Sequence, residues 1–529
     1  MASNDNLLSR LSNEVFGLII DELEQIDNLS LCDLRLACRA TNGLVEPKLF
    51  SSAFISFQPS ISAEVALFMT QKVKAMASGQ SPSSRHATNL VIGDIEGDRT
   101  SASPFYSYLV PAIEALKEVR CASIKITSEC SEGVLPALAC LPALQDLALR
   151  GPLTSRSKAY PLELCRFSHL RAIAFTSIIL SAPVVEEIKR IISLNRDTLE
   201  CITIRPNDWQ PINAAWAMWL TSQEPVKPAL IKLDVFFDGP VLPKVKEMAI
   251  NGDSITLSAS IMRQLHSLTA LEIKNGLAAA IPDSVWRSMG DAGVYLERLT
   301  YWPLSLAAVK YLTSYQGLTS FRLAAPAVWP VQYRIDEEPP DDNPRAIFDD
   351  VLRHHSKSLR KLFFSNLGTS SYGCTEQNVE AVLRCGKLDT LELVYELGHI
   401  DRSLPQQERT ISKTTCMDFS SLLTHINASL PNLHTLRVMP KRAAHRAHPY
   451  TSAAYNATHF RDMTDDCAEA ICAAKVDLKG KVGVPAFTVE LSATGKYGDC
   501  YVVNLVLLRY ERNSRHFGRV CGEPGDMDF

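Results

Sequence analysis

One apolar motif recurs along this chain and constrains its fold more than any other feature. The motif is an apolar residue, two residues of any kind, a second apolar residue, one of any kind, and a third apolar residue. Ten copies follow one another, and their first residues lie 22 to 45 positions apart. They begin at Leu144, Leu170, Leu199, Leu230, Leu268, Leu296, Leu318, Leu359, Leu388 and Leu433. Units repeated at this interval stack on their neighbours, so the sequence predicts an extended array.

The second half of each motif alternates apolar and other residues, which is the pattern of a short strand with one buried face. Between motifs the apolar residues change to helical spacing, as in the segment from Pro183 to Leu194, where the proline suits the first helical turn. Further helices are predicted over 105–119, 306–315, 347–355, 379–385 and 419–430.

Each repeat is therefore predicted to be one strand followed by one helix, and their spacing is that of a leucine-rich repeat. We expect an α/β fold, a single curved solenoid whose parallel strands line the concave face. Weaker copies of the motif at Ala87 and Cys121 extend the array toward the N-terminus. The alternative is an ordinary α/β domain in which the motif occurs by chance.

The last part of the chain has a different pattern. Residues 487–491 and 501–510 alternate strongly, and Gly495 and Gly498 lie between them. This predicts a hairpin that closes the end of the array, which a solenoid requires. The predicted organisation is a helical module over 1–55, the solenoid over 56–440 and a capping region over 441–529.

Composition excludes several classes of function. The formal net charge is −4 without a sustained basic stripe, so a nucleic-acid partner is not expected. No stretch approaches the ~18 apolar residues of a membrane span, and the N-terminus lacks a signal-peptide pattern. The 14 cysteines include no CxxC pair, which indicates buried free thiols in a reducing compartment. We therefore expect a cytoplasmic or nuclear protein.

The sequence carries no recognisable catalytic arrangement. It has no glycine-rich phosphate loop, no nucleophile elbow and no metal-binding helix; His354 and His355 are adjacent and so point in different directions on a helix. We therefore expect a chain that is not an enzyme and that needs no cofactor and no metal.

Within the first 50 residues, three segments follow a further pattern: Leu11 to Leu23, Leu29 to Arg39, and Pro47-Lys-Leu-Phe50. The first two resemble the first and second helices of an F-box, and the third is similar to the exit of its third helix in fungal members. The match departs from the usual motif at Ser12, where proline is common, and at Thr41, where an aromatic is common. A helix cap by the Ser12 hydroxyl offers a reason for the first departure.

This resemblance implies docking to a Skp-type adaptor, and through it to cullin and RING subunits. The residues that it places at the adaptor interface are Leu11, Ser12, Glu14, Val15, Ile19, Leu31, Leu34, Leu36 and Cys38. The alternative is that these helices only cap the solenoid. Val15, Ile19 and Leu34 distinguish the two, since docking needs them facing solvent and a cap buries them against the first repeats.

Strand residues between the apolar positions should face the concave side and contact a target protein. The predicted target-binding residues are Arg150, Arg205, Phe236, Lys274, Trp302 and Phe363, which combine cations with aromatic anchors of the kind found in binding hot spots. The competing interpretation is that neighbouring side chains cover these aromatics.

Three functions remain open. The first is a substrate receptor of an SCF-type (cullin-RING) ubiquitin ligase, whose protein substrate the sequence does not identify. The second is a leucine-rich-repeat interaction scaffold, and the third is an F-box protein that acts outside degradation.

Overall fold

The computed structural model describes residues 13–26, 28–37, 39–57, 63–95, 104–125, 131–151, 162–206, 231–237, 242–252, 254–274, 281–324, 343–365, 372–397, 419–442, 488–497, 500–511 and 516–519. The chain forms two compact units, Met1–Pro228 with Val235–Val245, and Ala229–Asp234 with Lys246–Phe529. In the described ranges, no helix combines the length and the apolar character needed to cross a membrane.

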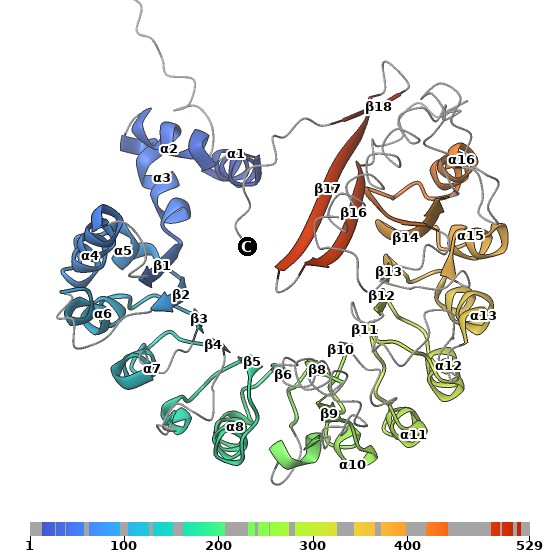
Figure 1. The fold of residues 1–529 in the computed structure, drawn as a ribbon, viewed down its shortest axis with the longest axis horizontal. Helices are drawn as coiled ribbons and strands as arrows, with labels where there is room; N and C mark the ends of the chain where they lie inside the picture. Colours follow the sequence, from blue (N-terminus) through green and yellow to red (C-terminus); the bar gives the residue numbers. More distant parts are fainter. Residues whose placement is uncertain are drawn as a thin grey trace, which may run out of the picture. The chain divides into compact units, whose positions relative to one another are not determined.

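The first unit opens with three helices, α1 (Asn13–Ile26), α2 (Asn28–Ala37) and α3 (Arg39–Leu49). Parallel strands then pair in chain order, with helices between them. The strands are β1 (Ser52–Phe57), β2 (Asn89–Ile95), β3 (Cys121–Lys125), β4 (Asp146–Arg150), β5 (Ala172–Ile178) and β6 (Cys201–Pro206). The helical segments are α4 (Ala63–Ala77), α5 (Pro82–His86), α6 (Pro104–Ala115), α7 (Ser131–Ala139), the 3-10 turn η2 (Leu164–Arg166) and α8 (Ala182–Asn195). Within this unit the strands follow the inner side of an arc and the helices its outer side (Figure 1).

The register explains why the motif builds a core. Leu147 of β4 pairs with Ile173 of β5, which pairs with Ile202 of β6, and all three side chains are buried. The third apolar position stacks in the same way two residues later. Each repeat thus buries its apolar row against the next one, as a solenoid requires.

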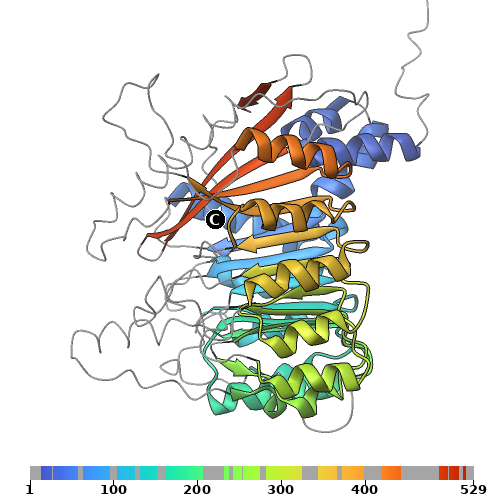
Figure 2. The same ribbon diagram turned by 90° about the vertical axis from the view of Figure 1, so that its right-hand side faces the viewer.

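The second unit repeats the arrangement. Its main sheet runs in chain order and is parallel as far as β16. The strands are β8 (Glu247–Asn251), β10 (Ala270–Lys274), β11 (Arg298–Thr300), β12 (Ser320–Ala324), β13 (Lys361–Ser365), β14 (Thr390–Leu397), β15 (Thr435–Arg442) and β16 (Thr488–Tyr497). The helical segments are α10 (Ala259–Met262), α11 (Asp283–Asp291), α12 (Leu306–Thr313), α13 (Pro344–Ala346), the π-helix η4 (Ile347–Leu352), α14 (Arg353–His355), α15 (Glu376–Leu383) and α16 (Phe419–Ser429). Figure 2 shows the green to orange helices of this unit stacked one above another beside the strands.

Local capping fixes where several of these helices begin. The hydroxyl of Ser305 accepts a hydrogen bond from the Ala308 amide at the start of α12, and Thr375 does the same for the Asn378 amide at the start of α15. These bonds satisfy amides that have no partner inside the helix. The fold is α/β with repeated strand and helix units, as the motif predicted.

The closing hairpin is also confirmed. Strand β16 pairs antiparallel with β17 (Cys500–Glu511), and β16 continues to Tyr497, so Gly495 lies inside the strand and not between the two strands as predicted. A further antiparallel strand that the sequence did not suggest, β18 (His516–Arg519), pairs with β17.

One predicted repeat is wrong. In the segment 230–235, the described residues form only the two-residue strand β7 (Ile231–Lys232), paired with β9 (Ile255–Thr256), and part of the 3-10 turn η3 (Leu233–Phe236). The strand that lies beside β10 is β8, whose motif is Val245-Met248-Ile250, with all three side chains buried. This segment also fits the motif, but with valine and methionine where the segment 230–235 has leucines.

The boundaries predicted at residues 55 and 440 fall inside strands β1 and β15. The division into three domains remains a prediction.

Candidate functional site

The three N-terminal helices have a core of their own. Phe16, Ile20, Leu31 and Val45 are buried together, and Leu23, Leu34 and Leu49 pack around them. On α1 the buried pair Phe16 and Ile20 is spaced by one helical turn, so the residues beside them face outward.

This small core leaves a set of apolar side chains on the surface of the module. Val15 is 44% exposed, Leu18 65%, Ile19 39%, Leu36 77% and Leu44 38%. They lie on all three helices. We call these five residues the module surface. Five large apolar side chains exposed on so small a module make it a candidate protein-interaction site.

The predicted adaptor-binding residues divide into three groups. Glu14, Val15, Ile19 and Leu36 are exposed. Leu31 is only 1% exposed and belongs to the core, so its prediction as a contact residue is corrected, and Leu34 packs partly against that core. Leu11, Ser12 and Cys38 lie outside the described residues. Sequence reasoning missed Leu18 and Leu44, because a helical stripe was assumed to have only one apolar side.

Polar contacts join the module to the repeats of its unit. The Glu46 carboxylate of α3 accepts a hydrogen bond from the Arg85 guanidinium of α5 at 3.0 Å, and His86 Nε2 lies 3.5 Å from the same oxygen. Within the module itself, Lys48 of α3 pairs with Asp21 of α1 at 2.6 Å. Thr41, one of the two departures from the F-box pattern, is buried.

The second candidate surface is the strand face of the first unit, which consists of the outward residues of β1 to β6. The register arranges these residues in three rows across the strands. The middle row contains Phe54 and Val91, which are 48% and 38% exposed, and then the small residues Ser123, Ala148, Ala174 and Thr203. The last row, which we call the basic row, contains Lys125, Arg150, Thr176 and Arg205 on four successive strands.

The carboxyl ends of β4 and β5 have unusual backbone conformations beside this row. Gly151 follows Arg150 with φ 113°, and its amide donates to the Thr176 carbonyl at 3.1 Å. Ser177 has φ 56°, in the left-handed region, where the register of β5 against β6 shifts by one residue. Such a bulge changes the direction in which the neighbouring side chains point.

In the second unit, three cations on the strands contact a partner on the same surface. Lys274 lies 3.3 Å from Glu272, and Arg298 pairs with Glu247. The Arg322 guanidinium lies over the Phe363 ring, 4.3 Å from its centroid.

The predicted target-binding residues separate by type. Arg150 and Lys274 are exposed and Arg205 is partly exposed. The predicted exposure of the three aromatics is wrong, since Phe236 is 0%, Trp302 2% and Phe363 8% exposed. Phe236 belongs to η3 instead of a strand, Trp302 lies beyond the end of β11, and Phe363 is covered by Arg322 from the preceding strand, β12.

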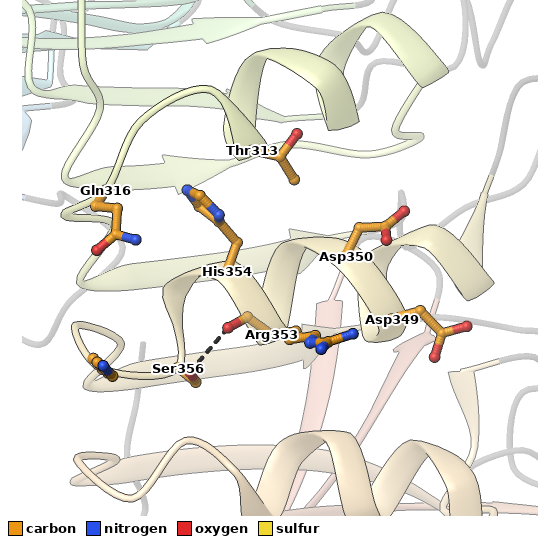
Figure 3. A pocket seen from close by; sticks show the side chains of 8 residues that line it. Thr313, Gln316, Asp349, Asp350, Arg353, His354 and Ser356 are labelled. Atoms are coloured by element: carbon orange, nitrogen blue, oxygen red, sulfur yellow. Dashed lines mark hydrogen bonds between the residues drawn. The ribbon is translucent and has the colours of Figure 1, made fainter.

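An open polar depression of about 500 Å³ lies on the helical side of the second unit, between α12 and the segment 349–357 (Figure 3). Asp349, Asp350, Arg353 and Lys357 give it mixed charge, and His354 Nε2 is 2.7 Å from the Tyr315 carbonyl oxygen. The Ser356 hydroxyl donates to the Arg353 carbonyl. The histidine and serine thus bond to backbone and not to each other. Across the described ranges, no group of three His, Cys, Asp or Glu side chains is placed to hold a metal ion.

Comparisons with known proteins give little further information. No family model matches the sequence, and no curated protein matches it. Among solved structures, the fold is similar to a structure described as the Rad7 and Elc1 complex in yeast, with 14% sequence identity and a TM-score of 0.39. The likeness covers 85% of this chain and 98% of that chain. A likeness this distant carries no argument about function.

Proposed function

We propose that this chain is a non-catalytic substrate receptor of an SCF-type cullin-RING ubiquitin ligase. The three-helix module docks a Skp-type adaptor, which links to the cullin and RING subunits, and the strand faces of the repeats bind the target protein. The protein acts in the cytoplasm or the nucleus and needs no cofactor.

One observation carries this proposal. The module closes a core of its own around Phe16, Ile20 and Val45, and yet Leu18 and Leu36 on its surface are more than half exposed. Exposing large apolar side chains is unfavourable by ~25 cal/mol per Å² unless a partner covers them. Of the three residues that distinguish docking from capping, Val15 and Ile19 are exposed by more than a third, whereas Leu34 packs partly against the module's own core. This supports a docking surface.

The adaptor interaction can be tested by co-expressing the full chain with a Skp-type adaptor subunit. The double variant Val15→Glu with Ile19→Glu should lose co-purification of the adaptor, because two carboxylates would be desolvated at an apolar interface. Both side chains already face solvent, so the circular dichroism spectrum should not change. Leu194→Glu is the matched control, since Leu194 is 56% exposed on α8 of the same unit. Adaptor binding that survives the double variant contradicts the proposal.

A scaffold whose helices only cap the repeats is the second candidate. The contact of Glu46 with Arg85 and His86 favours it, because it ties α3 to the first repeats. Deleting residues 1–50 separates the two functions. A docking module can be removed while the repeats stay folded, whereas loss of a cap exposes the first repeats and should unfold them.

A further inference from the structure

The first helix of the repeat array, α4, exposes large apolar side chains on its first two turns. Leu67 is 59% exposed and Phe68 63%, and Val65 beside them is 42% exposed. A single apolar side chain on a surface needs no explanation, whereas a contiguous group of them is a candidate interaction site. We call these three residues the α4 patch. They belong neither to the module surface nor to the strand face.

The place of α4 in the fold explains why the patch is uncovered. In the row of helices on the outer side of the first unit, α6 packs between α4 and α7, whereas α4 is the first helix of the row (Figure 1). Among the described elements, α4 therefore has a repeat helix on one side only. The short helix α5 lies near the other end of α4, where the Ser84 hydroxyl donates to the Met76 carbonyl at 3.2 Å.

Helical geometry places Phe68 on the side of α4 that faces away from α6. The Lys74 ammonium lies over the Tyr108 ring of α6, 5.7 Å from its centroid, so the side of α4 that carries Lys74 faces α6. Phe68 precedes Lys74 by six positions, which is about 120° around the helix. Lys72 follows Phe68 by four positions and therefore lies on the same side as Phe68, one turn further along.

The charges beside the α4 patch differ at its two ends. Glu64 is exposed one turn before Phe68, and Lys72 lies one turn after it. Lys72 is partly buried, and this burial lowers the pKa of its ammonium group, with no carboxylate among the described residues near enough to oppose the shift. An anionic group supplied by a partner would stabilise this ammonium. The surface thus asks for opposite charges on either side of an apolar contact.

We propose that the α4 patch binds an amphipathic helix of a partner protein, which continues the row of repeat helices on the side of α4 away from α6. Apolar side chains of the partner helix cover Leu67 and Phe68, a carboxylate pairs with Lys72, and a basic side chain pairs with Glu64. The array already buries its apolar rows by stacking helix on helix, and an amphipathic helix offers a matching stripe. This partner binds independently of the adaptor and the target of the proposed function.

The rise of α4 sets the spacing of the groups on the partner helix. Glu64 and Lys72 each lie four residues from Phe68, which is about 6 Å along the axis in either direction at ~1.5 Å per residue. A partner helix that packs along α4 therefore carries a basic residue, apolar residues one turn later and a carboxylate one turn after that. The same order serves a helix that runs in the opposite direction, because both spacings are one turn.

The test uses the full chain and a fluorescent, alanine-rich helical peptide that carries lysine, leucines and glutamate at these one-turn intervals. A second peptide has lysine at both charged positions, and a third has serine in place of the leucines. Fluorescence anisotropy should show saturable binding of the first peptide and binding about fivefold weaker for the second, because its extra lysine lies opposite Lys72. The third peptide should not bind, since it has no apolar stripe.

Two variants of the chain locate the binding on α4. Phe68→Glu should weaken binding of the first peptide by more than about tenfold, because it places a carboxylate in the apolar contact. Phe68 already faces solvent, so the circular dichroism spectrum should not change. Lys72→Glu should reverse the preference, so that the peptide with two lysines binds more tightly than the first. The matched control is Leu194→Glu, at a 56% exposed position on α8, which should change affinity by less than about twofold.

Other occupants of the patch give different results. A chain that sediments as a dimer and becomes a monomer on Phe68→Glu would assign the patch to a second copy. Loss of adaptor co-purification in the same variant would assign it to the adaptor. Either result overturns the inference, and so do equal effects of Phe68→Glu and Leu194→Glu or a failure of all three peptides to bind. Peptide binding in the expected order supports it, whether or not the chain binds the adaptor.

Discussion

Asn195 provides the sharpest test of how the repeats hold together. It lies at the last position of α8 and its side chain is 1% exposed. Its carboxamide oxygen accepts from the Leu170 amide at 2.8 Å, and its nitrogen donates to the carbonyls of Phe167 at 3.0 Å and Ile191 at 2.8 Å. Leu170 begins the repeat to which β5 and α8 belong, and Phe167 lies just before it, in the preceding repeat. One side chain therefore satisfies backbone groups of two repeats.

The expected effect of Asn195→Ala follows from the groups that it leaves without partners. The Leu170 amide and the Phe167 carbonyl become buried and unpaired, and each such group costs ~1–3 kcal/mol. The Ile191 carbonyl retains its place in the α8 hydrogen-bond ladder and adds little. The free energy of unfolding should therefore fall by about 2–6 kcal/mol.

Urea denaturation followed by circular dichroism measures this loss, and hydrogen exchange of the segment 162–206 localises it to the first unit. Asn195→Asp should be no better, because it keeps the acceptor for Leu170 but loses both donors and buries a charge. The control is Asn432→Ala, which removes a single exposed 3.4 Å bond and should cost less than ~1 kcal/mol. If Asn195→Ala cost no more than this control, the proposed link between repeats would be wrong.

Three further predictions follow from burial. Trp302→Ala should lower the free energy of unfolding by ~3–5 kcal/mol, as for a core aromatic, whereas the control Leu306→Ala, at a 55% exposed position, should change it by less than ~1 kcal/mol. Similar urea midpoints for the two variants would contradict the burial of Trp302. Burial lowers the pKa of His355 to about 4, below its ordinary 6.5. Between these two pH values the unfolded chain binds a proton that the folded chain does not, so the free energy of unfolding should fall as the pH is lowered from 6.5 to 4, by at most ~1.4 kcal/mol per pH unit. A His355→Gln variant with the same pH dependence would exclude this histidine as the cause. Burial raises the pKa of the Cys385 thiol to about 12. Iodoacetamide should therefore modify the exposed Cys32 in the native protein and Cys385 only after unfolding, as measured by mass spectrometry. Modification of Cys385 in the native protein would contradict its burial.

The repeat architecture was readable in the sequence because it depends on local periodicity. Alternation of Leu147 and Leu149 with other residues is enough to form a strand with one buried face, and the spacing in the segment from Pro183 to Leu194 is enough to form a helix. The closing hairpin was predicted on the same basis, from alternating segments on either side of glycines. Each of these patterns is short enough for the sequence to show it directly.

Contacts between repeats decided the rest. Periodicity places Phe363 on the strand face, but Arg322 covers it from the neighbouring strand, and no pattern within one repeat contains that contact. For the same reason Leu31 has the spacing of a surface stripe, yet it closes the core that α1 and α3 form around it.

The choice between two competing strands was likewise made by packing. The segment 230–235 has the better apolar motif, but Val245-Met248-Ile250 is the one that pairs beside β10. A sequence determines which side of a strand is apolar, because that depends on two-residue alternation. Only the tertiary structure determines which strand joins the sheet and which side chains remain exposed, because both depend on residues that the neighbouring repeats supply.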